Sequence, residues 1–262
     1  MTIETIIEYL DAELHPEYQE KYDNAGFLLG DPQIECTGVL VAVDLTDDVI
    51  SEALERDCNL IVTHHPMIFG GVKRITPKDA VGRHIFRLIK SDIAVYAAHT
   101  NLDNLKNGVN GILAYQLGLT NCHILRQMDG QPSEDVGAGM IGTLPYPLPA
   151  EAYLEQVKMT LRLPVLRIGD IKNQVVSRVA ICGGAGSFLI DDAVRQEADV
   201  YLTGDLKYHD FQHAQGRVTL ADIGHFESEQ FTKELIYSII SKKFSNFACF
   251  ISTRGRSFVN YI

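Results

Sequence analysis

Two adjacent histidines, His64 and His65, follow the apolar run at residues 59–63 and are followed by Pro66. Proline cannot donate a ladder hydrogen bond, so we expect the strand to end at this pair. Neighbouring strand residues point to opposite faces, so the rings share one site only where the backbone turns, or each binds a different ion. Imidazole is the commonest metal ligand, and the pair therefore suggests a metal site; an ordinary polar strand end is the alternative.

A second pair of chemically capable residues, His225 and Glu229, is four apart at the start of a helix that we predict to continue to about Lys243. Residues at this spacing share one helical face. The same face continues into Ile236 and Ile240 and so becomes buried, where a carboxylate needs a partner. A metal is one such partner, and a capping or salt-bridged pair is the alternative.

Five candidate metal ligands lie at the ends of predicted strands or at the helix start that follows one: His64, His65, Asp103, His225 and Glu229. Five donors are too many for one tetrahedral ion with an open position. They suit two ions with one bridging carboxylate, an arrangement that activates water and stabilises leaving oxygens. Mixed imidazole and carboxylate donors fit Zn, Mn, Fe, Co or Ni, so we predict two divalent ions per chain without assigning the element.

Three further residues are candidates for catalysis. His99 ends the apolar run at residues 93–98 and is a further ligand, a donor behind the ligands or a proton shuttle, unless it is an ordinary strand-end histidine. Asp205 and His209 follow the strand predicted at residues 199–203. We expect these two side chains to bind substrate or to orient the ligands.

Strands alternate with helices along the chain, which predicts an α/β fold with a parallel or mixed sheet and functional groups at the carboxyl ends of the strands. Helices are predicted at residues 3–14, from Thr46 onward, at 79–90, 108–117, 151–161 and 191–197, and up to about 243. Strands are predicted at residues 38–43, 59–63, 93–98, 137–143, 178–182, 199–203, 218–221 and 246–252.

The order of strand, acidic helix and strand occurs twice, and Thr63 and Thr203 hold the same place in each copy. We interpret this as an internal duplication, with a first α/β half at residues 1–125 and a second at residues 126–262. The boundary is approximate and is based on the change of pattern that ends in prolines at 145, 147 and 149. Related strand ends in two halves suggest one site between them.

Composition limits the classes of partner and compartment. The 262 residues are 46% hydrophobic and carry a formal net charge of -11, which opposes binding to nucleic acid or to an anionic membrane. Five scattered cysteines without a CxxC motif fit a reducing cytosol. The N-terminus is unlike a signal peptide, and no apolar run reaches about 18 residues. We therefore expect a cytoplasmic protein with neither a membrane nor a nucleic-acid partner.

Several motifs together resemble one family, the GTP cyclohydrolase I type 2 homologues, also called Nif-three-like proteins. The motifs extend from about Tyr22 to Glu229 and include THHPMIF, AHTNLDNLKNGVNGILAYQLGL, VAICGGAGS, ADVYLTGDLKYHD and DIGHFESEQ. The resemblance implies two interlocked α/β halves with mixed sheets flanked by helices. It also implies a toroidal homohexamer whose dinuclear metal centres face an internal cavity.

The resemblance also implies roles for the five ligands. His65 and Asp103 hold one ion, His64 and His225 hold the other, and Glu229 bridges them. Two positions depart from the family pattern without touching a ligand. Tyr22 stands where tryptophan is usual, and Ser228 stands where threonine is common.

The family label implies attack of a metal-bound hydroxide on the guanine ring of GTP, with release of formate. A nucleotide also needs cations, for which Lys73, Arg74 and Lys207 are candidates. Our leading hypothesis is a metal-dependent hydrolase acting on a nucleotide-like or other small substrate. The alternative is a non-enzymatic, metal-binding hexameric ring that serves as a metal chaperone, reservoir or interaction scaffold.

Overall fold

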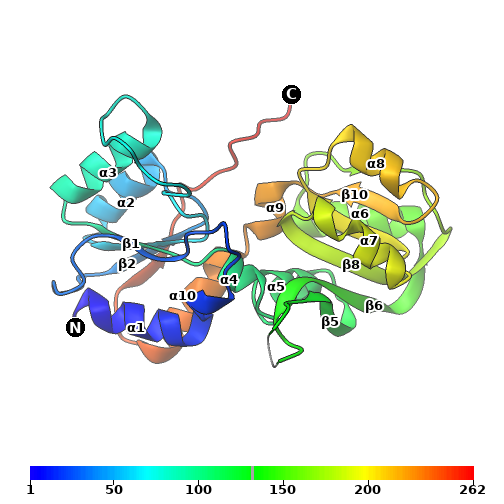
Figure 1. The fold of residues 1–262 in the computed structure, drawn as a ribbon, viewed down its shortest axis with the longest axis horizontal. Coiled ribbons are helices and arrows are strands. Elements are labelled where there is room, and N and C mark those ends of the chain that lie inside the picture. The colour runs from blue at the N-terminus through cyan, green and yellow to red at the C-terminus, as the bar shows by residue number, and fades with distance from the viewer. Residues whose placement is uncertain (131–132) are drawn as a thin grey trace. The chain divides into compact units, whose positions relative to one another are not determined.

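The computed structural model describes residues 1–130 and 133–262, which form two compact units (Figure 1). Unit 1 consists of Met1–Leu102 with Thr232–Arg256, and unit 2 of Asp103–Phe231 with Ser257–Ile262. The chain thus leaves unit 1 after Leu102 and returns to it at Thr232, so neither unit is one continuous segment. The two halves that we expected, residues 1–125 and 126–262, were defined from the repeat in the sequence, and this division stays a prediction.

Unit 1 contains a five-stranded mixed sheet in the order β1-β4-β3-β2-β11. Its strands are β1 (Gly26–Leu29), β2 (Val39–Ala42), β3 (Leu60–Thr63), β4 (Ala94–Ala97) and β11 (Cys249–Ile251). Only β1 runs antiparallel to its neighbour within this sheet. Every residue of β2, β3 and β4 is buried, which accounts for their unbroken apolar runs.

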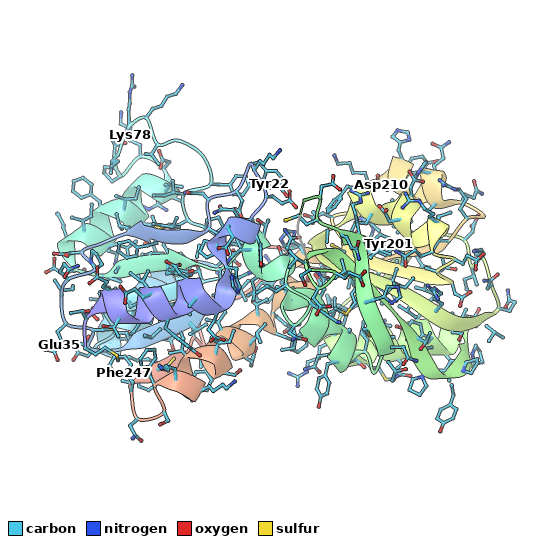
Figure 2. All side chains as sticks on the ribbon, turned by 60° about the horizontal axis from the view of Figure 1, so that its bottom comes forward. Tyr22, Glu35, Lys78, Tyr201, Asp210 and Phe247 are labelled. Carbon is cyan, nitrogen blue, oxygen red and sulfur yellow. The ribbon has the colours of Figure 1, made fainter. Side chains whose placement is uncertain are left out.

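Two helices of unit 1, α2 (Asp47–Glu55) and α3 (Ala80–Lys90), begin directly after a capping side chain. The others are α1 (Ile3–Leu14), α10 (Thr232–Lys243), the short 3₁₀ turn Pro16–Tyr18 and most of α4 (Thr100–Asp103). The Thr46 hydroxyl accepts a hydrogen bond from the Val49 amide at 3.2 Å, and the Asp79 carboxylate accepts one from the Gly82 amide at 2.7 Å. The segment before α3, which carries Lys78, stands out from unit 1 as a loop (Figure 2).

Unit 2 contains a six-stranded mixed sheet in the order β5-β6-β8-β9-β10-β7. Its strands are β5 (Thr120–Gln127), β6 (Gly137–Pro149), β7 (Arg167–Ile168), β8 (Val175–Ala185), β9 (Val200–Gly204) and β10 (Thr219–Asp222). Its helices are α5 (Val109–Gln116), α6 (Ala150–Leu161), α7 (Ile190–Arg195), α8 (Tyr208–Ala214), α9 (His225–Glu229) and the 3₁₀ turn Ser187–Leu189. Strands β8, β9 and β10 are parallel, and the outer pairs are antiparallel. The predicted α/β class is confirmed.

One arrangement occurs in both units. Unit 1 has β2-α2-β3-α3-β4 and unit 2 has β8-α7-β9-α8-β10, each with three parallel strands. The buried Thr63 and Thr203 lie at the carboxyl ends of the two middle strands. The Thr63 hydroxyl donates to the His65 carbonyl at 2.7 Å, and the Thr203 hydroxyl donates to the Gly184 carbonyl at 3.1 Å. The common order supports the predicted duplication.

Two expectations are corrected. The single helix that we predicted to reach Lys243 is two helices, α9 and α10, separated at Gln230 and Phe231. The break lies where the chain passes from unit 2 to unit 1. Strand β6 continues beyond the predicted end at residue 143 to Pro149. Its register with β8 is irregular between Thr143 and Leu148, the stretch that contains Pro145 and Pro147, which have no N–H to donate. Among the described residues, no helix combines the length and apolar character needed to cross a bilayer.

Candidate metal centre

Three of the histidines of unit 1, His64, His65 and His99, gather at the carboxyl ends of β3 and β4. These strands are parallel neighbours, so their ends meet at one edge of the sheet. The backbone turns after Thr63, and the rings of His64 and His65 lie with their centroids 4.8 Å apart. The His99 ring lies 5.4 Å from that of His64 and 5.6 Å from that of His65. The predicted turn therefore brings both adjacent histidines to one place.

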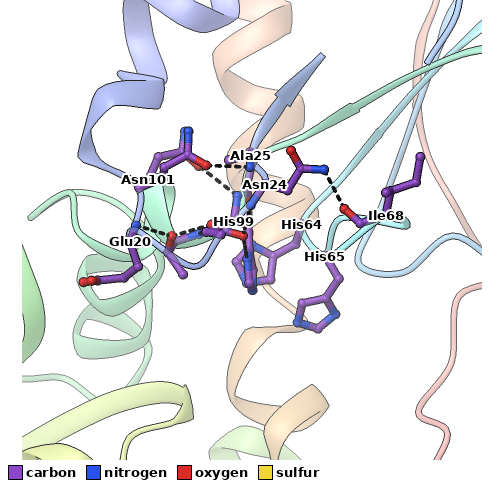
Figure 3. Close-up of polar contacts among 12 residues, drawn as sticks. Glu20, Asn24, Ala25, His64, His65, Ile68, His99 and Asn101 are labelled. Atoms are coloured by element: carbon purple, nitrogen blue, oxygen red, sulfur yellow. Dashed lines mark hydrogen bonds and ion pairs between the residues drawn. The ribbon is translucent and has the colours of Figure 1, made fainter. Parts of the chain in front are cut away.

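Each of these rings is held through its Nδ1 atom. His64 Nδ1 donates to the Ala98 carbonyl at 2.7 Å, and His65 Nδ1 donates to the Asp44 carboxylate at 2.7 Å. His99 Nδ1 donates to the Asp23 carboxylate at 2.7 Å, close to the two other histidines (Figure 3). In a neutral ring this hydrogen bond places the lone pair on Nε2, the tautomer that metal-ligating histidines use.

Asp23 is a buried carboxylate that stays charged. Burial by itself raises the pKa of Asp23, but hydrogen bonds from His99 and Thr100 outweigh it and hold the pKa at about 2. The Thr100 amide donates at 3.0 Å, its hydroxyl donates as well, and the Asn24 amide donates at 2.7 Å. A negative charge at this position orients the His99 ring through its Nδ1 atom.

The donors of unit 2 lie on α9. His225 Nε2 lies 3.2 Å from the Glu229 carboxylate, so the predicted shared face is confirmed. His225 Nδ1 is 2.8 Å from the Asp205 carboxylate, which follows β9. Glu229 is buried, and His225 is partly exposed. Asp205 therefore contacts Nδ1 of His225 in the same way that Asp44 contacts Nδ1 of His65.

The Glu229 carboxylate packs closely against Gly184, where a side chain would not fit. A Cβ atom on Gly184 would lie 2.3 Å from Glu229 Oε1, and the backbone has φ +62 there. The Gly184 amide donates to the Ser228 hydroxyl at 2.9 Å, and that hydroxyl donates to the His225 carbonyl at 2.7 Å. The glycine-rich end of β8 thus fits closely against α9.

Asp103 is linked through Asn110 to the glycine-rich end of β8 in unit 2. Its carbonyl accepts from the Asn110 amide group at 3.1 Å, and Asn110 Oδ1 accepts from the Gly183 amide at 3.0 Å. Burial, followed by the nearby charges of Asp103 and Glu229, raises the pKa of the Cys182 thiol. Both carboxylates therefore face the same part of β8.

The remaining sequence candidate, His209, has other contacts. It is exposed on α8, its Nδ1 atom lies 3.1 Å from Gln212 Oε1 and its ring contacts Tyr208. Its part in substrate binding stays a prediction. Asp23, Asp44 and Gly184 also support the site, and none of them was predicted from the sequence. Asp44 follows the end of β2, so the rule that led to the histidines could have found it.

Comparisons with known proteins give a consistent result. The model of the Duf34/NIF3 (NGG1p interacting factor 3) family matches residues 1–255. A Clostridium perfringens protein named GTP cyclohydrolase 1 type 2 homolog is 35% identical over 231 residues, 87% of each chain. A Campylobacter jejuni protein of the same name is 33% identical over 238 residues, 90% of each chain. The crystal structure of Staphylococcus aureus protein SA1388 matches with a TM-score of 0.91 at 31% identity, covering 100% of this chain and 99% of that one.

Proposed function

The chain belongs to the Duf34/NIF3 family, and on this premise we propose that it is a metal-dependent hydrolase acting on a nucleotide-like or other small substrate. We assign His65 and Asp103 to one divalent ion and His64 and His225 to a second. Glu229 bridges them in this proposal. Within unit 1 the rings of His64 and His65 lie 4.8 Å apart, and within unit 2 His225 Nε2 lies 3.2 Å from the Glu229 carboxylate, which supports the assignment.

The observation that carries the proposal is the way the imidazole rings are held. His64, His65, His99 and His225 each use Nδ1 toward a backbone carbonyl or a carboxylate, at 2.7 to 2.8 Å. Protein metal sites orient their histidines in this manner, and such partners also raise the basicity of the ligand. The occurrence of this pattern at four histidines, at strand ends and at the start of α9, favours metal ligands over ordinary polar strand ends.

The donor set also fits the chemistry of the proposed reaction. A bound pair of divalent ions supplies Lewis acidity and a more acidic water molecule. Asp44 and Asp205 fix the tautomers of His65 and His225. We assign to His99 the transfer of a proton at Nε2, because Asp23 holds its Nδ1. Asp205 and His209 remain our candidates for contacts with substrate.

The test begins with elemental analysis of protein purified without added metal. We expect about two ions per chain in the parent and losses in His65→Ala and Glu229→Ala. Metal-loaded parent is then given GTP and a panel of nucleotides and other small phosphorylated compounds, with formate and product release as readouts. Full metal content without turnover would refute the hydrolase and favour the metal chaperone, reservoir or scaffold.

A subtler variant tests the observation itself. Asp44→Asn keeps the shape of the side chain but removes the charge that His65 contacts, so we expect metal affinity to fall about ten- to hundredfold. Competition with a coloured chelator measures that affinity. Asp48→Asn, an exposed carboxylate on α2, is the matched control and should bind metal as the parent does.

A further inference from the structure

Three consecutive residues of one loop contact three different parts of the unit 1 site. Asp23 holds His99, as described above. Asn24 donates from its side-chain amide to the Ile68 carbonyl at 2.6 Å (Figure 3). The Tyr22 ring lies beside the Phe69 ring, with centroids 6.3 Å apart and planes tilted by 42°. The loop therefore joins the segment after His65 to the histidine cluster.

The two aromatic rings are exposed although they border a polar site. Tyr22 is 63% exposed and Phe69 is 54% exposed. The Phe69 ring also contacts the His99 ring, with centroids 6.0 Å apart and planes at 76°. Large exposed aromatic side chains that adjoin polar, oriented groups are typical of ligand-binding surfaces.

The segment that contains Phe69 also contains two positively charged side chains. Lys73 and Arg74 follow Phe69 closely, and both are exposed. They stand in a chain whose formal net charge is -11, so this segment differs in sign from the protein as a whole. A flat apolar ring surface followed by two cations matches the two parts of a nucleotide, a planar base and an anionic phosphate group.

We propose that Tyr22 and Phe69 form a stacking subsite for a planar heteroaromatic ring of the nucleobase class, and that Lys73 and Arg74 bind the attached phosphates. The subsite deepens the proposed function, because it names the part of the substrate that unit 1 recognises beside the metal ligands. The rings position the substrate. The chemistry stays with the metal ligands and His99.

The test separates the two parts of the ligand. Guanosine supplies the ring and inorganic triphosphate supplies the charge, and each is titrated calorimetrically into the metal-loaded full chain. For Tyr22→Leu and Phe69→Leu we expect guanosine binding to weaken about five- to hundredfold, with triphosphate binding unchanged. For Lys73→Ala/Arg74→Ala we expect the opposite pattern. Phe86→Leu is the control, since Phe86 is a 44% exposed phenylalanine on α3.

Three results would overturn the subsite. One is unchanged guanosine affinity in both leucine variants. The second is parent protein that binds none of guanosine, adenosine, cytidine and uridine. The third is a loss of metal in the leucine variants, because the rings would then support the metal centre instead of a ligand. Ring binding without any turnover would refute the hydrolase alone and leave the subsite standing.

Discussion

At the scale of single residues, the carboxylate of Glu229 depends on the missing side chain of Gly184. We predict that Gly184→Ala loses bound metal, because its Cβ would lie 2.3 Å from Glu229 Oε1 and would displace the carboxylate. The left-handed backbone adds a cost of about 1–2 kcal/mol in the free energy of unfolding. Elemental analysis and urea unfolding measure the two effects.

Gly216→Ala is the matched control for that substitution. Gly216 has φ +69, but a Cβ there would meet no atom within 4 Å. We expect a similar loss of stability with full metal content. Equal metal content in the two alanine variants would show that the close approach to Glu229 has no role in binding.

Asp23 gives a prediction about pH. Its pKa in the folded protein is about 2, below its ordinary value of 3.8, so its charge stabilises the fold above that ordinary value. The contribution, about 1–2 kcal/mol after screening by water, is lost as the pH falls through 2. We expect Asp23→Asn to be less stable than the parent at pH 5 and equally stable near pH 2. Denaturant unfolding of metal-free protein across this range measures it, and a difference that persists at pH 2 would contradict it.

At the scale of elements, one buried carboxylate fixes the returning C-terminal segment. Glu52 on α2 accepts hydrogen bonds from the Ser252 hydroxyl at 2.7 Å and the Thr253 amide at 3.1 Å, just after β11. The Arg56 side chain donates to it at 3.0 Å. This carboxylate therefore joins α2 to a segment about two hundred residues later in the chain.

We predict that Glu52→Ala lowers the free energy of unfolding by about 2–3 kcal/mol, because buried donors lose their acceptor. Urea unfolding measures the loss. Glu55→Ala, which removes an exposed partner of Arg254 from the same helix, should have a much smaller effect. Similar losses in the two variants would mean that the Glu52 hydrogen bonds do not hold the C-terminal segment.

At the scale of the whole molecule, the assembly is the main open prediction. The family resemblance implies a toroidal homohexamer, so we expect light scattering to give the mass of six 29.1 kDa chains. Dilution distinguishes a stable ring from weak association. A monomer at micromolar concentration would contradict the prediction, and the metal assignments would be unaffected because every proposed ligand lies in one chain.

The sequence by itself indicated many of the helices and strands, and it placed the candidate histidines at strand ends. Apolar periodicity and caps are local signals, so α1 and α3 begin and end close to their predicted residues, and α2 begins directly after Thr46 as predicted. The histidines were found at strand ends for the same reason, since a strand's end is visible in its own residues. The shared face of His225 and Glu229 also follows from helical spacing alone.

Only the tertiary structure decided which distant groups support those residues. Asp44 contacts His65 because β2 and β3 are parallel neighbours, and β11 pairs with β2 although their sequences are far apart. The break between α9 and α10 occurs where the chain changes unit. Such partners are set by packing between segments that are distant in sequence. Spacing along the chain therefore does not show which groups contact each other.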